Sequence, residues 1–214
     1  MKRIVYLIFV ALIIISACTK SNKTPTPHPI PLTVTINGNN YNTVIVNNQL
    51  WTAINYNGPG GVNYAGGAND TTKGKLYTWA EAKAVSLPAG WRLPTQADYT
   101  NLLIAVGAQQ TGGVYITSGS EQLLLMSTTG WSTSNGNNKL GFNAEPAGYY
   151  NQLTLNNQQF SGQGAAAVFL TSSPYAQGDT YPLTFEITAS DAQFTNVDVL
   201  PTDRASVRFV TDSF

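Results

Sequence analysis

The 214-residue sequence has very few of the side chains on which nucleophilic and metal-dependent enzymes depend. It contains one cysteine, Cys18, and one histidine, His28, which lies in a proline-rich segment. A Ser-His-Asp triad, a Cys-His pair or a histidine-rich zinc site therefore cannot be assembled. With a single cysteine, the chain forms no internal disulfide and no multi-cysteine metal site. We expect no catalytic residues of these kinds, no metal ion and no other cofactor.

Charged residues are also scarce, at 10% of the sequence, with eleven Lys and Arg against eleven Asp and Glu. The basic residues form no run along the chain. Neutralising the phosphates of DNA or RNA requires clustered Lys and Arg. Nucleic acid is therefore excluded as an expected partner.

The N-terminus has the three parts of an export signal. Lys2 and Arg3 precede an apolar run over residues 4–15, and Ser16 and Ala17 stand directly before Cys18. This run is shorter than the roughly 20 residues that span a bilayer as a helix. Residues 15–18 resemble a lipobox, in which the cysteine is lipidated and the preceding residues are removed. We predict a signal peptide over residues 1–17 and a lipid anchor on Cys18 that attaches the protein to a membrane.

The segment after Cys18 predicts a tether over residues 18–32. Prolines at positions 25, 27, 29 and 31 favour an extended chain and exclude a helix. The acidic residues that often follow the anchor cysteine of surface-exported Bacteroidetes lipoproteins are missing here. From the lipid anchor we expect a place in the cell envelope, at the outer membrane. Because those acidic residues are missing, we leave open whether the domain faces the periplasm or the exterior. Residues 33–214 are long enough for one globular domain. The chain as a whole has 43% apolar residues, which is enough to form a hydrophobic core.

Within this domain the sequence predicts short strands, two helices and further strands. Two Asn clusters, at residues 37–40 and 47–48, are typical of tight turns between strands. A first helix is predicted from Tyr77 to about Val85, and a second follows Thr95, whose hydroxyl suits an N-cap with Asp98 three residues later. The likeliest later strands are residues 123–126, 165–170, 183–187 and 206–210.

A set of motifs occurs in order along the domain. The sequences NQLWT, YTWAEA, GWRLPT, GFNAEPAGY, AVFLTSS and ASVRFV stand at residues 48–52, 77–82, 90–95, 141–149, 167–173 and 205–210. Together they resemble the FISUMP domain, the Fibrobacter succinogenes major paralogous domain, over nearly all of Val34 to Asp212. That family looks related to the C-type lectin-like fold and to formylglycine-generating enzymes. The resemblance implies an α+β, C-type lectin-like architecture, with two helices flanking a small twisted antiparallel sheet and with long loops.

We first interpret the motif residues as structural residues that pack in the core or cap a helix. Pro94 restrains the residue before it to an extended conformation, and Arg92 is expected to pair with a carboxylate such as Glu81 or Asp98. The full set of predicted structural residues is Trp51, Trp79, Trp91, Arg92, Leu93, Pro94 and Thr95. Formylglycine generation needs active-site cysteines, so the resemblance does not extend to that activity.

Carboxylates provide no diagnostic motif for a calcium site or a hydrolase. Those in predicted loops or strand ends are Glu145, Asp179, Asp191, Asp198 and Asp203. Sugar-binding C-type lectins coordinate calcium through Glu-Pro-Asn or Gln-Pro-Asp and Trp-Asn-Asp, whereas here Ala147 follows Glu145-Pro146 and no Trp-Asn-Asp occurs. A solvated surface carboxylate is the default interpretation of each.

Aromatic residues beside amides are the remaining candidates for a ligand site. They are Trp131, Tyr149, Tyr150, Tyr175 and Tyr181. Such rings can stack on sugars or pack against a protein partner. They can equally cover the hydrophobic core of the domain while their hydroxyl groups contact water. We predict a non-catalytic, lipid-anchored binding or adhesion module for a glycan, peptide or protein partner. The alternatives are a structural subunit of a surface appendage or envelope assembly, and a carboxylate-based hydrolase.

Overall fold

The computed structural model describes residues 33–67, 70, 72–152, 159–195 and 200–212. The predicted signal peptide, Cys18 and the predicted tether lie outside the described residues. Within the described part of the chain, no helix is both long enough and apolar enough to cross a membrane.

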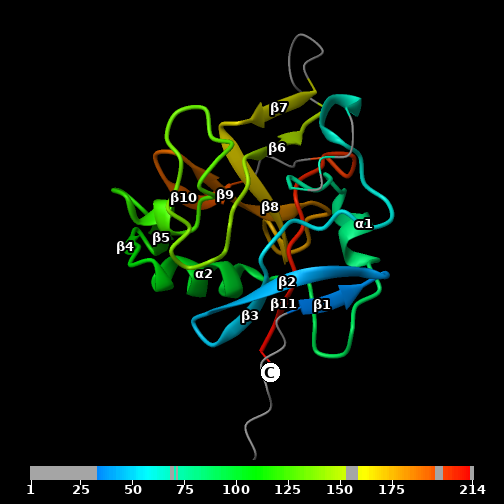
Figure 1. Cartoon of the computed structure of the whole chain (residues 1–214), viewed down its shortest axis with the longest axis horizontal. Coiled ribbons are helices and arrows are strands. Elements are labelled where there is room, and N and C mark those ends of the chain that lie inside the picture. Colours follow the sequence, from blue (N-terminus) through cyan, green and yellow to red (C-terminus); the bar gives the residue numbers. More distant parts are fainter. Residues whose placement is uncertain (1–32, 68–69, 71, 153–158, 196–199, 213–214) are drawn as a thin grey trace, which may run out of the picture.

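The described residues form three sheets and two short α-helices (Figure 1). The first sheet has the order β1 (Thr33–Ile36), β2 (Asn39–Val46), β3 (Gln49–Thr52) and β11 (Val210–Thr211). The second has the order β10 (Ala192–Thr195), β9 (Pro182–Thr188), β8 (Ala166–Pro174), β6 (Ala147–Tyr150) and β7 (Phe160–Gln163). The third pairs β4 (Gln109–Thr111) with β5 (Val114–Ile116). The helices are α1 (Trp79–Lys83) and α2 (Gln96–Ala105), with 3₁₀ turns η1 (Tyr64–Gly66) and η2 (Glu121–Leu124).

The predicted α+β, C-type lectin-like arrangement of two helices flanking a small sheet is wrong, because the described fold is mostly β. Both predicted helices are present but short, with five residues in α1 and ten in α2. The apolar segments between residues 166 and 195 pair with one another instead, as β8 with β9 and β9 with β10. Together with β6 and β7, these strands form a five-stranded sheet.

The local turn and cap predictions are confirmed. Asn37 and Gly38 have φ of 49° and 80°, and Asn47 and Asn48 have φ of 48° and 61°, which are the left-handed conformations of two-residue hairpin turns. Thr95 is the N-cap of α2, and its hydroxyl accepts from the amide N–H of residue 98. Each of these features depends on residues within four positions of one another.

One of the later strand predictions is wrong, and another is confirmed for one residue only. Residues 121–124 form the 3₁₀ turn η2, because a short apolar run suits a buried turn as well as a strand. The segment 206–210 contributes only its last residue to β11, because its backbone groups bond in turn to several different segments. The predictions for residues 165–170 and 183–187 are confirmed by β8 and β9.

Strand β8 lies at the centre of the molecule and separates two apolar clusters (Figure 1). Successive side chains of a strand point to opposite faces of its sheet. Ala167 and Phe169 therefore pack into the first cluster, which also contains Trp51 and Tyr99. Ala166, Val168 and Leu170 pack into the second cluster on the opposite face. This arrangement buries β8 on both faces.

The tryptophans and Leu93 of the motifs are buried or half-buried, and Arg92 forms ion pairs. Trp51 is fully buried, Leu93 is buried in the second cluster, and Trp79 and Trp91 are half-buried against that cluster. Arg92 donates to both oxygens of Asp98 and, across 2.6 Å, to Asp212. The partner of Arg92 is therefore Asp98 and not Glu81, which pairs with Arg204 at 2.6 Å.

Candidate functional site

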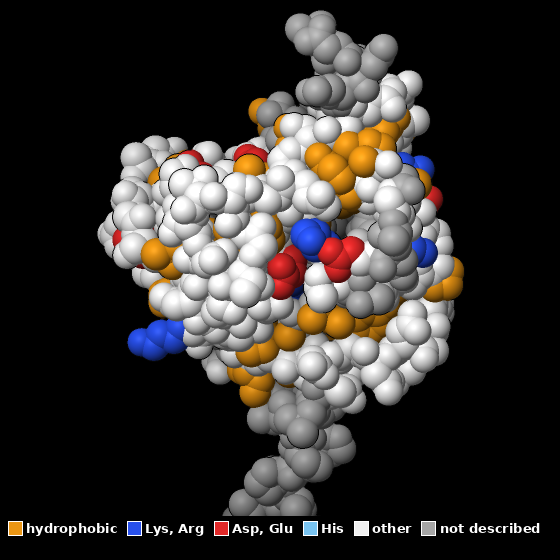
Figure 2. Space-filling model, turned by 45° about the horizontal axis from the view of Figure 1, so that its top comes forward, with side chains coloured by type: hydrophobic (Ala, Val, Ile, Leu, Met, Phe, Trp, Pro, Cys, Tyr) orange, Lys and Arg blue, Asp and Glu red, His pale blue; other side chains and the backbone are white. Residues whose placement is uncertain are grey.

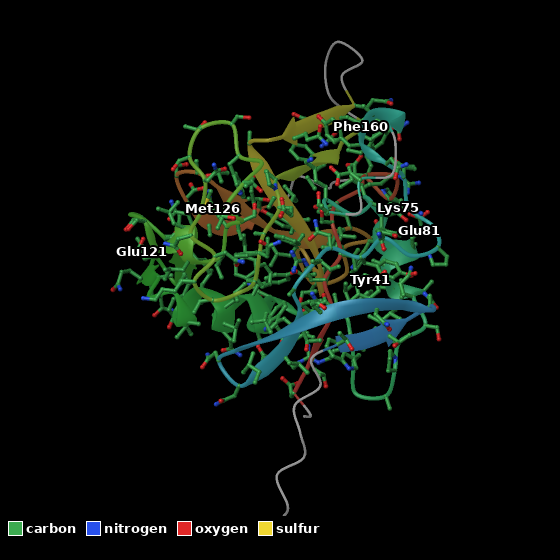
Figure 3. The ribbon with its side chains drawn as sticks, viewed as in Figure 1. Tyr41, Lys75, Glu81, Glu121, Met126 and Phe160 are labelled. Carbon is green, nitrogen blue, oxygen red and sulfur yellow. The ribbon has the colours of Figure 1, made fainter. Side chains whose placement is uncertain are left out.

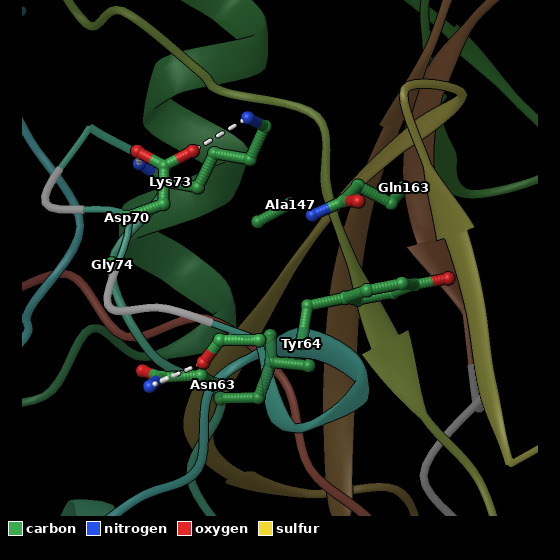
Figure 4. Close-up of a pocket in the computed structure, with 9 residues that line it drawn as sticks. Asn63, Tyr64, Asp70, Lys73, Gly74, Ala147 and Gln163 are labelled. Atoms are coloured by element: carbon green, nitrogen blue, oxygen red, sulfur yellow. Dashed lines mark hydrogen bonds and ion pairs between the residues drawn. The ribbon is translucent and has the colours of Figure 1, made fainter.

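A small pocket lies between η1, the segment that follows it, and strands β6 and β7 (Figure 4). Its volume is about 240 Å³, below the range of roughly 300–1,000 Å³ typical of sites for drug-sized ligands. It is lined by Asn63, Tyr64, Gly67, Asp70, Lys73, Gly74, Leu76, Ala147 and Gln163.

One glycine lets these segments approach closely. Gly148 has φ of +72°, and a Cβ at this position would lie 2.3 Å from the Ser161 carbonyl oxygen and 2.9 Å from the ring of Tyr64. Only glycine adopts this backbone conformation without cost and leaves that space empty. Gly148 therefore brings β6 against β7 and against η1, which places neighbouring Ala147 in the pocket wall.

The two charged groups of the pocket neutralise each other. Lys73 Nζ lies 2.7 Å from Asp70 Oδ2, and the backbone N–H groups of residues 72 and 73 donate to the other oxygen. The hydrogen bonds from Lys73 and Thr72 hold the pKa of Asp70 well below its usual range. The ion pair therefore adds no net charge to the pocket.

Two amide side chains keep hydrogen-bonding capacity that the protein does not use. Asn63 Nδ2 donates to the Gly67 carbonyl at 3.0 Å, but its buried Oδ1 has no partner among the described residues. Gln163 is exposed on β7, and within the described part its amide makes no hydrogen bond. Buried polar atoms are nearly always satisfied in folded proteins, so an unsatisfied acceptor at a pocket wall is a site for an external donor.

A row of aromatic rings extends from the pocket along β6 and β7. The ring centroids of Tyr64 and Phe160 are 5.2 Å apart, and those of Phe160 and Tyr150 are 5.0 Å apart. Figure 3 shows Phe160 at the start of β7, beside η1. Tyr150, one of the predicted ligand-contacting residues, therefore belongs to a cluster that reaches the pocket through Phe160.

The other predicted aromatic residues are placed elsewhere. Trp131 is only 7% exposed, and its Nε1 donates to Ser127 Oγ at 3.0 Å, so its ring is part of the core. Tyr149 is half-buried against the second cluster. Tyr175 and Tyr181 stack on each other, with centroids 5.9 Å apart, between β8 and β9, and Tyr175 is 48% exposed. The pocket and this tyrosine pair are separate surfaces.

Most of the predicted loop carboxylates bind nearby backbone or side-chain groups. Asp179 accepts from the Ala176 N–H, Asp191 from the Thr188 hydroxyl, and Asp203 from the N–H groups of residues 152 and 200. Asp198 lies outside the described residues. Among the described residues, no group of three or more His, Cys, Asp or Glu could hold a metal ion.

Glu145 is the one predicted carboxylate close to the pocket. It is buried, two residues before Ala147, and accepts from Asn143 Nδ2 at 3.1 Å. Burial raises the pKa of Glu145, and this effect is opposed by the hydrogen bonds from Asn143 and Ser127 and by the positive charges of Arg208 and Lys73. Lys73 thus lies within electrostatic reach of both Asp70 and Glu145.

The residues that make the pocket polar were not among the predicted site residues. Asn63 and Tyr64 are adjacent, so they match the pattern of a ring beside an amide that identified the other candidates. They lie in a Gly-rich loop without periodicity, and their partners Lys73 and Gln163 are 10 or more positions away. Only the fold brings these four side chains to one surface.

The geometry defines a class: a mostly β domain whose described residues form a small polar pocket, with a paired Asp and Lys, beside a row of aromatic rings. The sequence comparison adds the family. The model of the Fibrobacter succinogenes major domain matches residues 36–211, and the chain belongs to that family. No curated protein and no solved structure matches the chain.

Proposed function

We propose that this protein is a non-catalytic binding module, held by a lipid on Cys18 at the outer membrane of the cell envelope. Its pocket takes one small polar unit of a larger partner molecule. The observation that carries this proposal is the buried Oδ1 of Asn63, which has no partner among the described residues, in a pocket that also holds the exposed amide of Gln163 and the ring of Tyr64. Concave sites with few, well-placed polar groups and an aromatic wall are typical of ligand pockets.

The pocket lies far from the N-terminal strand of the described chain. Figure 1 shows β1, where the described chain begins, at one end of the molecule, and η1, β6 and β7 at the other. A membrane anchor before Thr33 would therefore hold the domain by the end far from the pocket. The pocket would then face away from the membrane, where a partner has access.

Binding is tested by screening the purified full chain, immobilised in detergent, against arrays of glycans and peptides. We expect saturable binding that is lost in Tyr64→Ala and Gln163→Ala. Tyr175→Ala is the matched control, because it removes an exposed ring on the separate tyrosine pair. No saturable binding to either array would contradict the proposal, and stable co-purification in a large complex would favour a structural subunit instead.

The anchor is tested by the intact mass of the membrane-extracted protein beside a Cys18→Ala variant. We expect a chain that begins at Cys18 and carries acyl groups, and we expect the variant to lack them. An unprocessed or unlipidated wild-type chain would contradict the anchor. Protease treatment of whole cells then distinguishes an external domain, which is cut, from a periplasmic one, which is protected.

A carboxylate-based hydrolase is the second candidate, and Asp70 and Glu145 favour it. Hydrogen bonds from Lys73 and Thr72 lower the pKa of Asp70, whereas burial raises that of Glu145. Glycoside hydrolases use two carboxyl groups of different pKa that flank one cleft; here Asp70 lines the pocket, and Glu145 is buried two residues before the lining residue Ala147. Release of reducing sugar from a glycan, abolished by Glu145→Gln with binding retained, would support this function. Intact glycan after prolonged incubation with the wild-type protein would exclude it for that glycan.

A further inference from the structure

The charge balance of the pocket selects against charged ligands. Asp70 and Lys73 form a close ion pair, drawn as a dashed line in Figure 4, and each is held by the other. An anionic ligand at Lys73 would meet the Asp70 carboxylate, and a cationic ligand at Asp70 would meet the ammonium group. On the face shown in Figure 2, acidic and basic side chains are few and those near the centre lie side by side.

The unsatisfied groups of the pocket match a hydroxyl group. The free Oδ1 of Asn63 needs a donor, and the amide of Gln163 offers both donors and an acceptor. A hydroxyl both donates and accepts, so a ligand with several hydroxyls satisfies both side chains without any charge. Figure 4 shows the Gln163 side chain extending from β7 above the ring of Tyr64, so that amide and ring lie at the same opening.

The remaining walls suit a compact ring with one apolar face. Tyr64 provides an aromatic surface, and its contact with Phe160 holds it in place. Leu76, Gly74 and Ala147 are small or apolar wall residues. The volume of about 240 Å³ admits a single small ring and not a drug-sized ligand.

We propose that the pocket binds one neutral pyranose unit of a glycan, with its hydroxyls on Asn63 and Gln163 and its C–H face on Tyr64. This inference rests on the proposed binding function and specifies its ligand class. Because the two charged groups among the described lining residues, Asp70 and Lys73, are paired with each other, we expect binding to depend little on salt.

The test is a titration of the full chain with three methyl glycosides of similar size: a neutral hexoside, its uronic acid and its amino sugar. We expect the neutral hexoside to bind at least about tenfold more tightly than either charged one. Gln163→Glu should weaken neutral binding and reverse the order in favour of the amino sugar, because a carboxylate replaces the neutral amide at the opening. Gln110→Glu, an exposed glutamine on β4, is the matched control and should change neither affinity.

Two outcomes overturn the inference and are distinguishable from each other. If a peptide or a charged glycoside binds more tightly than the neutral one, and Tyr64→Ala abolishes this binding, the neutral-sugar assignment is wrong while the binding function stands. If none of these ligands binds the wild-type protein and the array screen is also negative, both proposals are wrong. Affinity for the hexoside that Tyr64→Ala and Gln163→Glu leave unchanged would place sugar binding elsewhere on the molecule and overturn the assignment to this pocket.

Discussion

The guanidinium of Arg208 donates to the side-chain oxygen of Asn55 across 2.6 Å in the interior of the domain. Arg208 is completely buried, and it also donates to the carbonyl oxygens of Thr52, Phe142 and Asn143 at 2.7, 2.9 and 2.8 Å. No described carboxylate forms an ion pair with it. Burial lowers its pKa to about 9, so it stays charged at neutral pH. One side chain thus joins the end of β3, the loop before β6 and the C-terminal segment.

Replacing this arginine by an apolar residue is expected to destabilise the domain strongly. Arg208→Met would leave four buried acceptors without a donor, at a cost of about 1–3 kcal/mol for each that finds no new partner. We expect the free energy of unfolding in urea to fall by more than about 3 kcal/mol. Arg204→Met is the control, because its ion pair with Glu81 is partly exposed and worth roughly 1 kcal/mol or less. Equal losses for the two variants would contradict the central role of Arg208.

Gly148 is expected to tolerate no side chain. In Gly148→Ala the new methyl group would overlap the Ser161 carbonyl, so β6 and β7 must separate and the pocket must change shape. We expect a loss of more than about 2 kcal/mol in unfolding free energy, together with loss of ligand binding. Gly112→Ala is the control, since Gly112 also has a positive φ, of +60°, but open space around it. A loss at Gly148 no larger than that at Gly112 would show that backbone conformation alone matters.

The Asp98 carboxylate is expected to stabilise the fold at neutral pH but not in acid. Burial alone would raise its pKa, but hydrogen bonds from Arg92, Thr95 and Gln49 outweigh burial and hold the pKa below its ordinary value. A lowered pKa in the folded state stabilises the protein above the unfolded pKa of about 3.9, and this contribution is lost as the pH falls through the folded value. Asp98→Asn should cost about 2 kcal/mol or more at pH 7, and the difference should shrink below about pH 4.

This prediction is checked by urea unfolding of both proteins at pH 7 and at the lowest pH where each still folds. Asp179→Asn, in the loop between β8 and β9, is the control and is expected to change stability by about 0.5 kcal/mol or less at either pH. A cost for Asp98→Asn that is independent of pH would mean that packing, and not charge, accounts for it.

Glu186 is expected to behave in the opposite way. Burial raises its pKa, and the nearby charge of Asp191 raises it further. A raised pKa in the folded state means that the charged form costs free energy on folding above that pKa, so Glu186→Gln should stabilise the protein at pH 7. The gain is expected to be about 1 kcal/mol or less and to disappear as the pH falls through the unfolded pKa of about 4.3, below which Glu186 is protonated in both states. A destabilising effect at pH 7 would reveal a favourable partner for the carboxylate.

Features that depend on neighbouring residues were predictable from the sequence. The Asn-rich turns and the Thr95 cap follow from short-range geometry, whereas the choice of Asp98 over Glu81 as the partner of Arg92 came from the structure. The family resemblance came from ordered motifs and is confirmed by the match over residues 36–211. The fold inferred from that resemblance was wrong, because the extent of strand pairing depends on contacts that no single motif contains.

The sequence by itself determined the turns, the helix caps, the family and the lack of histidine and cysteine in the domain, since each depends on residue type or on spacing of a few positions. Only the tertiary structure decided that Trp131 is buried, that Arg208 is central and that Asn63, Tyr64, Lys73 and Gln163 share one pocket. The physical reason is distance along the chain. Gln163 lies near η1 because its strand β7 pairs with β6, which in turn pairs with β8. Burial and proximity of this kind come from the packing of the sheets as a whole.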